Sequence, residues 1–528
     1  MNTRTAPINP WLIAVVVVIP TFMEVLDTTI ANVALRYIAG GLSAAEVDSE
    51  WVITSYLAAN AIILPVTGWI TAHLGRRNYF LLSIAVFAVA SMMCGFAPNL
   101  ATLIVFRVIQ GLAGGGLQPC SQGILLDTFP AEKQGAAQTL FGVAALVAPV
   151  LGPTLGGWIT EAYSWRWIFF INGPIGVLAL FAASALVRDP EYLVQARQEN
   201  RGRPLRFDSI GLGLLVLTIA SWEILLSKGQ EWDWLGDPFG RIQILLAIFV
   251  IGLGTFIFWE LRTPEPIVSF RPLRDRNFAL SCVILFSCFA VLLAASTQLP
   301  MLLESVLGYD SLNAGLVLSP AGFFTVTATI IAGRLLGMKV DARWLIGTGL
   351  VITAIGNFWM SRMNLDISPS FAVWPRAVLT TGLGLIFAPI NVAAFLYIPQ
   401  KLRGAAVGLL ALLRNEGGSF GTTVAQTITE RREQLHTLRL NEFLDPLNPA
   451  VNSYLQTLTP DYLRHVSDPV LAHNMALRSM EALRDQQALG LSFFDGFLIY
   501  AIIGLLLACL VPFMKRSVVE RKGPLPAE

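Results

Sequence analysis

Apolar segments of about 20 residues, long enough to cross a bilayer as helices, recur along this chain. Fourteen of them are separated by mostly short polar connections. Barrel strands would be about half as long and would alternate in polarity, and only helices satisfy the backbone in lipid over such lengths. The sequence therefore predicts an all-α polytopic membrane protein with 14 spans. The segments cover residues 11–37, 51–72, 79–97, 101–125, 135–159, 166–187, 208–227, 241–261, 277–303, 311–333, 343–362, 371–397, 402–429 and 491–514.

Composition excludes several other classes of protein. The chain is 55% hydrophobic and only 13% charged, whereas soluble domains carry about 25% charged residues. A net charge of +1 provides no basic field for nucleic acid. The five cysteines lie inside apolar segments without CxxC spacing, and no GxxxxGK[ST] loop is present. We therefore expect no metal, no cofactor, no nucleic-acid partner and no ATP-driven pump.

Lysine and arginine are concentrated in alternate loops, which places those loops in the cytoplasm. Both termini fall on this basic side, as an even number of spans requires. The exception is the stretch 431–490, which is polar, mixed in charge and located on the opposite side. Within it, residues 434–443 and 470–483 look helical, and prolines separate them. We expect a compact extracytoplasmic helical hairpin.

The chain contains an internal repeat at an offset of 269 residues. Spans 1–6 and 9–14 then form two parallel six-helix halves, with spans 7 and 8 inserted between them. Parallel repeats of this kind are typical of rocking transporters; the alternative is a chance similarity between helices rich in small residues. The coinciding landmarks are Gly68 with Gly337, Arg107 with Arg376, Pro130 with Pro399, and residues 135–137 with 404–406. The expected units are an N-terminal bundle (1–190), a cytoplasmic linker with two inserted helices (191–270), and a C-terminal bundle (271–528) that includes the loop 431–490.

Two acidic residues, Glu24 and Asp27, interrupt the first span. A spacing of three places both carboxylates on one helical face. An ionised acid inside a membrane costs about 2.5 kcal/mol or more, so the pair should face a partner or water, and proximity should favour a proton on one of them. The alternative is that either residue only ties span 1 to a neighbouring helix.

The fourth span carries Arg107, which needs an anion or several carbonyl groups. It is a candidate countercharge that alternately holds and releases a carboxylate; the alternative is that it satisfies a helix end. Its repeat mate Arg376 follows Pro375 at the entrance of a span, and there we expect a structural role.

Further motifs lie in span 5, in the loop after span 2 and in span 13. In span 5, two prolines predict a kink and a GxxxG spacing predicts close helix packing. The loop after span 2 predicts a tight basic cytoplasmic turn that could gate. In-membrane charges in span 13 are candidates for substrate contact or local pairing, while Glu223 in span 7 is expected to be structural. The span 5 residues are Gly152, Pro153, Gly156 and Gly157. The loop residues are Gly68, Gly75, Arg76 and Arg77, and the charges in span 13 are Arg414 and Glu416.

Together these motifs resemble the major facilitator superfamily, and within it the 14-span drug:proton antiporters of the EmrB/QacA type. The resemblance covers nearly the whole chain. It rests on the arginine at 107, the GPTLGG motif, and three further segments. Those segments are LDTTIANVA at 26–34, WVITSY at 51–56 and WRWIFFIN at 165–172.

The resemblance implies a major facilitator fold, proton coupling through Asp27 and Arg107, and export rather than uptake for the motif at 152–157. One departure is Ala72, where the family usually has an acidic residue; the repeat mate Asp341 is acidic. The loop 431–490 is similar to that of EmrB-like members that hand substrate to a periplasmic adaptor and an outer-membrane channel, which implies a Gram-negative inner membrane.

The resemblance therefore implies a proton-coupled antiporter that exports hydrophobic drugs or toxic compounds across the inner membrane by alternating access, as the inner-membrane part of a tripartite efflux system. The alternatives are an exporter of a specific metabolite, fatty acid or siderophore, and a proton symporter. A membrane enzyme is disfavoured because the four histidines lie in loops without convergent catalytic partners.

Overall fold

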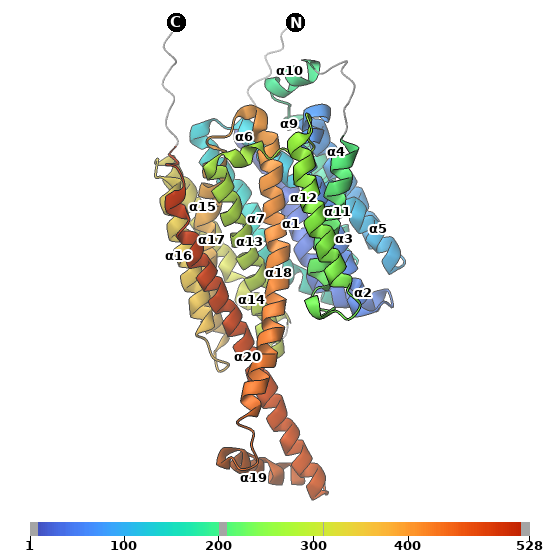
Figure 1. Ribbon diagram of the computed structural model, residues 1–528, viewed down its shortest axis with the longest axis vertical. Helices are drawn as coiled ribbons and strands as arrows, with labels where there is room; N and C mark the ends of the chain where they lie inside the picture. Colours follow the sequence, from blue (N-terminus) through green and yellow to red (C-terminus); the bar gives the residue numbers. More distant parts are fainter. Residues whose placement is uncertain (1–8, 200–207, 310, 519–528) are drawn as a thin grey trace.

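The computed structural model describes residues 9–199, 208–309 and 311–518, and the regular elements within these ranges are all helices (Figure 1). Each of the 14 apolar segments forms helix, as the sequence predicts. The N-terminal half contains α1 (Pro10–Gly41), α3 (Trp51–Leu74), α4 (Arg76–Gly95), α5 (Leu100–Gly114), α6 (Leu117–Thr128), α7 (Ala131–Ala162), α8 (Trp167–Phe170) and α9 (Asn172–Leu186). The C-terminal half contains α13 (Arg276–Met301), α14 (Ser311–Leu318), α15 (Pro320–Gly337), α16 (Ala342–Ser361), α17 (Pro369–Phe395), α18 (Arg403–Asn441), α19 (Pro449–Leu463) and α20 (Pro469–Ala508). Between the halves lie α11 (Ser209–Lys228) and α12 (Arg241–Arg262), and the short helices α2 (Glu46–Ser49) and α10 (Glu191–Glu199) lie in connections.

The number of helices able to span a membrane agrees with the expected architecture. Twelve helical units in the described ranges are long and apolar enough to cross, and α7, bent by 48°, makes 13. The fourteenth expected span is α18, whose buried Arg414 and Glu416 lower its apolar content. The count of 14 therefore stays a prediction.

Three spans expected as single helices are each built from two, and one of them, at 166–187, divides into α8 and α9 at Ile171. The span at 101–125 breaks into α5 and α6 at the glycine run 114–116, and the span at 311–333 breaks into α14 and α15 at Ser319, before Pro320. Glycine runs and proline are common causes of such breaks, since glycine favours no single backbone conformation and proline removes a helix hydrogen bond.

Helix packing follows the 269-residue repeat. In the N-terminal half α1 packs on α7, and in the C-terminal half their repeat mates α13 and α18 pack together. Contacts between the halves form a matched pair as well, because α3 packs on α18 while α15 packs on α7. The two interfaces between the halves are thus related by the repeat.

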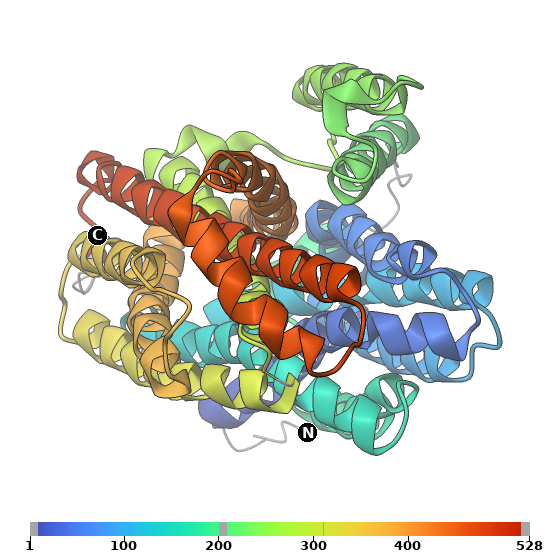
Figure 2. The same ribbon diagram turned by 90° about the horizontal axis from the view of Figure 1, so that it is seen from below.

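The inserted helices form a pair at the periphery, beside α3 (Figure 2). Only 17% of the most apolar stretch of α12 is buried within the protein. In contrast, α11 contacts both α3 and α18. The hydroxyls of Thr54 and Ser227 lie 2.8 Å apart, and Thr423 Oγ1 donates to the carbonyl of Leu226 at 3.2 Å. One inserted helix therefore touches both halves.

The element expected at 431–490 is helical, but its construction differs from the expected separate hairpin. Residues 434–441 continue α18, and residues 470–483 begin α20, so both spanning helices run on beyond the bundle (Figure 1). The third helix, α19, lies at the far end and contains Pro460 in its interior, where the sequence suggested a break. Pro449 and Pro469 do begin helices, as their fixed φ favours.

Candidate functional site

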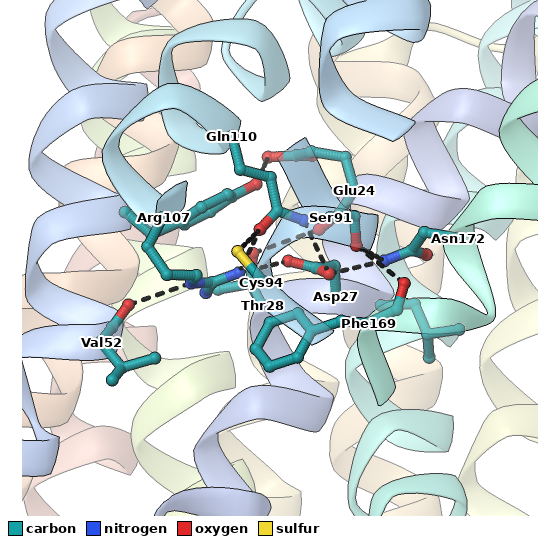
Figure 3. Close-up of polar contacts among 12 residues, drawn as sticks. Glu24, Asp27, Thr28, Val52, Ser91, Cys94, Arg107, Gln110, Phe169 and Asn172 are labelled. Carbon is teal, nitrogen blue, oxygen red and sulfur yellow. Dashed lines mark hydrogen bonds and ion pairs between the residues drawn. The ribbon is translucent and has the colours of Figure 1, made fainter. Parts of the chain in front are cut away.

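A buried ion pair joins α1 to α5 in the N-terminal half. Arg107 Nη1 lies 2.6 Å from Asp27 Oδ2, and the two side chains are 0% and 1% exposed. Asp27 Oδ1 also accepts hydrogen bonds from Gln110 Nε2 at 3.0 Å and from Asn172 Nδ2 at 2.6 Å. Arg107 Nε donates to the carbonyl of Val52 at 3.0 Å. Donors from α5 and α9 thus converge on one carboxylate (Figure 3).

Aromatic rings complete the surroundings of the arginine. The guanidinium carbon lies 4.1 Å from the ring centre of Tyr56 and 5.6 Å from that of Phe169, within the range of cation–π attraction. A buried ion pair survives in a membrane because each charge compensates the other. Adding a proton to Asp27 would remove that compensation and leave Arg107 without a countercharge. The arrangement can therefore convert protonation into a change of helix contacts.

Glu24 lies almost one turn before Asp27 but in a different network. It accepts hydrogen bonds from Asn60 Nδ2 at 3.0 Å, from Tyr56 Oη at 3.3 Å, and from Gln118 Nε2. These donors come from α3 and α6, whereas the donors to Asp27 come from α5 and α9. Tyr56 belongs to both networks, because its hydroxyl meets Glu24 and its ring meets the arginine.

The Glu24 network crosses to the C-terminal half. Gln118 accepts a hydrogen bond from Arg414 Nη2 while it donates to Glu24, so the amide relays between a carboxylate and a guanidinium. The Arg414 guanidinium also lies 5.6 Å from the ring centre of Phe141 and 5.5 Å from that of Phe289. A buried charge of the C-terminal half is thus tied to α1 through α6.

Glu416 does not share the partners of Arg414. Its carboxyl group is buried beside that of Glu223 on α11, and the two interact electrostatically. Ser419 Oγ donates to Glu223 Oε2 at 3.0 Å. Glu223, expected to lie outside the repeated core, therefore contacts a core helix.

The glycines of span 5 lie where α7 meets α1. A Cβ at Gly152 would lie 2.6 Å from Cβ of Thr29, and a Cβ at Gly156 would lie 3.3 Å from the carbonyl oxygen of Ile30. At Gly157 a Cβ would meet no described atom within 4 Å. The side chain of Pro153 lies outside the described part of the structure.

The loop between α3 and α4 holds a second ion pair. Gly75 closes α3 with φ of +89°, a conformation that favours glycine. Arg76 is buried, bonds to Asp127 on α6, and donates to the carbonyl of Gly123 at 3.0 Å. Asp127 Oδ1 also lies 3.8 Å from Arg403 Nη1 on α18. One aspartate of the N-terminal half therefore faces arginines from both halves.

The other two residues of the expected gate have different surroundings. Arg77 Nε and Nη2 donate to the carbonyls of Val187 and Ser184, at 2.9 and 2.8 Å, which ties α4 to the end of α9. Gly68 is at a contact between the halves, because a Cβ there would lie 3.2 Å from the amide nitrogen of Ala405. Gly68 thus lies at a contact between the halves, whereas Arg77 ties two helices together within the N-terminal half.

Comparison with known proteins gives the family. The model of the Major Facilitator Superfamily matches residues 17–422. The chain belongs to this superfamily. The multidrug export protein EmrB of Escherichia coli K12 is 37% identical over 441 residues, which cover 83% of this chain and 84% of EmrB. The fatty acid resistance protein FarB of Neisseria gonorrhoeae is 36% identical, covering 82% and 83%.

A solved structure shows the same fold at low sequence similarity. The proton:xylose symporter XylE, bound to 6-bromo-6-deoxy-D-glucose, superposes with a TM-score of 0.63 at 14% identity and covers 96% of both chains. The predicted EmrB-type relationship and the all-α major facilitator fold are therefore confirmed. As a member of this superfamily the chain is a multi-pass membrane transporter and not an enzyme.

The sequence analysis did not identify several polar residues in the interior of the helix bundle. Gln110, Asn172 and Gln118 each bond to a carboxylate of α1, and Asp127 bonds to Arg76. A signal was available, since each is a polar side chain inside an apolar segment, where polar groups are rare unless they have a partner. Asn60, in span 2, belongs to the same class.

Proposed function

We propose that this chain is a proton-coupled antiporter that exports hydrophobic compounds across the inner membrane by alternating access. The relatives named for multidrug export, fatty acid resistance and colistin resistance support an efflux role. The buried Asp27–Arg107 pair supports proton coupling, because it is an ionisable pair inside the membrane that neutralises itself only while Asp27 is ionised.

In the proposed cycle, a proton arriving from outside neutralises Asp27. Arg107 then loses its countercharge and must find new partners, which costs several kcal/mol in a low-dielectric interior unless the helices rearrange. Movement of α1 relative to α5 is transmitted to α7, which packs on α1 at Gly152 and Gly156. Because α7 also packs on α15 of the other half, this movement changes the contact between the halves.

The test uses Asp27→Asn in proteoliposomes with an imposed pH gradient. The amide keeps the shape of the side chain but cannot titrate, so we expect proton-driven export to be abolished while folding and insertion are retained. Asp461→Asn, an exposed aspartate on α19, is the matched control and should export at the wild-type rate. Wild-type export by Asp27→Asn would refute coupling at this residue.

We also propose that the element formed by the ends of α18 and α20 together with α19 docks a periplasmic adaptor protein, which passes substrate to an outer-membrane channel. This element protrudes from the bundle (Figure 1). It presents exposed apolar side chains, which are costly to hydrate and typical of interaction sites when they gather. The exposed apolar residues are Phe443, Leu447, Leu463, Val470 and Leu471.

The geometry defines which part can be removed. Arg484 Nη1 donates to Asn441 Oδ1 at 2.8 Å, so α18 and α20 are adjacent at these two residues. Beyond this point α19 packs on α20, with Tyr454 and Ser479 hydroxyls 3.4 Å apart. Replacing residues 443–483 with a short Gly/Ser linker therefore removes the tip while the ends it joins are already close together.

We expect the tip deletion to preserve proton-driven export by the purified protein in liposomes and to remove drug resistance in Gram-negative cells, where substrate must also cross the outer membrane. A linker of equal length inserted into the full chain after Leu447 controls for the linker itself. Loss of export in liposomes would place the tip in transport or folding, and unchanged cellular resistance would refute docking.

The same proposal places both termini in the cytoplasm. The last described segment is held beside two loops of the basic side, since Lys515 Nζ lies 2.9 Å from Asp275 Oδ2 and Ser517 N donates to Asp341 Oδ1 at 3.2 Å. Cysteine labelling with a membrane-impermeant maleimide at Arg516→Cys should succeed only in inside-out vesicles.

A further inference from the structure

The C-terminal half repeats the geometry of the Asp27–Arg107 pair with one partner changed. At the offset of 269 residues, Arg107 corresponds to Arg376 and Asp27 corresponds to Ser296. Arg376 Nη2 donates to Ser296 Oγ at 2.6 Å, the same separation as between Arg107 Nη1 and Asp27 Oδ2. The arginine contact is thus kept in both halves, but in the C-terminal half it reaches a neutral hydroxyl.

Arg376 is left without compensation. The residue is 2% exposed, and its Nε and Nη1 atoms have no hydrogen-bond partner among the described residues. The side chain that Arg376 contacts is the neutral hydroxyl of Ser296, and no ion pair in the described ranges balances its charge. Arginine does not lose its proton in proteins. A buried and unpaired cation is costly in a membrane, and the charge needs an anion.

The other partners of Arg107 have also changed in the C-terminal copy. Gln110 corresponds to Leu379, which has no polar group, and Tyr56 corresponds to the smaller Thr325. The carbonyl that corresponds to that of Val52 belongs to Ala321, and it accepts a hydrogen bond from Thr380 Oγ1 at 3.2 Å instead.

We propose that Arg376 binds a small monovalent anion, a halide or a carboxylate, beside the Ser296 hydroxyl that stands in the place of the Asp27 carboxylate. The anion accepts from the open donor Nη1, the same guanidinium nitrogen through which Arg107 meets Asp27, while Ser296 keeps Nη2. The site is separate from the proton-coupling proposal, because Arg376 lies in the other half and shares no described contact with Asp27. Free inorganic ions and the head of an anionic amphiphile offer the same chemistry.

The test is the thermal unfolding of the purified full-length protein in detergent, with chloride replaced at constant ionic strength by methanesulfonate, which is neither a halide nor a carboxylate. We expect a saturable rise of a few degrees in the unfolding midpoint of the wild type as chloride increases. Arg376→Met should abolish this rise and should be more stable than the wild type without chloride, because it replaces an uncompensated charge with an apolar side chain of similar length.

Ser296→Asp is the decisive variant. Because it supplies the carboxylate that the N-terminal half already has, it should raise the unfolding midpoint in chloride-free buffer and abolish the response to chloride. Ser305→Asp, at an exposed serine, is the matched control and should keep the wild-type response. A wild-type midpoint indifferent to every anion tested, or a chloride response retained in Arg376→Met, would overturn the proposal.

Formate and decanoate distinguish the source of the anion. Equal stabilisation by chloride and formate, lost in Arg376→Met, identifies a free small ion. Stabilisation by decanoate alone, absent with decanol and lost in Arg376→Met, identifies the carboxylate head of an amphiphile. Both outcomes support an anion at Arg376, and the transport assay of Asp27→Asn is independent of either.

Discussion

Gln122 Nε2 donates a hydrogen bond to Asn391 Oδ1 at 2.7 Å, and these residues are separated by 269 positions, the offset of the internal repeat. Each is therefore the repeat mate of the other. Two equivalent positions can touch only close to the axis that relates the halves, so α6 and α17 approach each other at that axis. Both residues are buried, at 1% and 0% exposure.

We predict that Gln122→Leu or Asn391→Leu alone destabilises the protein by about 1–3 kcal/mol, because each change leaves a buried polar partner unsatisfied. The double variant should lose less stability than the two single variants together, since it also removes the amide that each single change leaves without its partner. Unfolding midpoints of the three variants form a double-mutant cycle that measures the coupling. Additive losses would show that the bond contributes little.

Gly156→Leu should block transport or folding, because the backbone of α1 leaves no room for a branched side chain at this contact. Gly157→Leu, the adjacent residue, should be tolerated, since a Cβ there meets no described neighbour within 4 Å. Expression and export of the two variants are compared in the same liposome assay. Equal behaviour of the two would contradict the close approach of α7 and α1.

Glu24→Gln should lower the unfolding midpoint, because it removes the negative charge that reaches Arg414 through Gln118. Arg414→Met combined with Glu24→Gln should recover part of this loss, since the double variant holds no uncompensated charge at the bridge. No recovery would mean that Glu24 and Arg414 act independently. Export should be reduced less by Glu24→Gln than by Asp27→Asn.

Asp341 gives the N-terminal end of α16 a pH-dependent cap. Burial acts to raise the pKa of Asp341, but hydrogen bonds from Arg343 and from the backbone of Arg343 and Ser517 outweigh it and hold this pKa below the usual value. A carboxyl with a lowered folded pKa stabilises the fold above its unfolded pKa of about 4 and loses that contribution as the pH falls through the folded value.

Asp341→Asn keeps the capping shape but removes the ion pair with Arg343, and should therefore lower stability by roughly 0.2–1 kcal/mol at neutral pH. The difference between variant and wild type should shrink when the pH is lowered below about 4. Thermal unfolding at several pH values measures both. A difference in stability that does not change with pH would mean that Asp341 stabilises the helix through its hydrogen-bonding shape and not through its charge.

Sequence patterns were sufficient for the helices and for the motif residues on them. The apolar segments located the helices of the bundle, because bilayer thickness and backbone hydrogen bonding leave few alternatives. Asp27 and Arg107 could be chosen because charges inside such segments are rare. That they bond to each other could not be derived from spacing, since the contact depends on how α1 and α5 pack.

The remaining contacts depend on packing between distant parts of the chain. The 269-residue repeat aligns Arg107 with Arg376 and Asp27 with Ser296. The difference between aspartate and serine matters only because both arginines contact the equivalent residue, which the structure shows. The pairing of Glu416 with Glu223 likewise required the position of α11. The long extensions of α18 and α20 were read as a separate hairpin because prolines and polar residues interrupt the apolar pattern.

The inserted helix α11 gives the two seams between the halves unequal access to lipid. One seam, between α3 and α18, is covered by α11, which contacts both helices. The matching seam, between α7 and α15, has no inserted helix in contact with it in the described ranges. The seam between α3 and α18 is therefore shielded from the surrounding lipid by a helix that its repeat-related counterpart lacks in the described ranges, so the symmetry of the repeat holds within the bundle but not at its periphery.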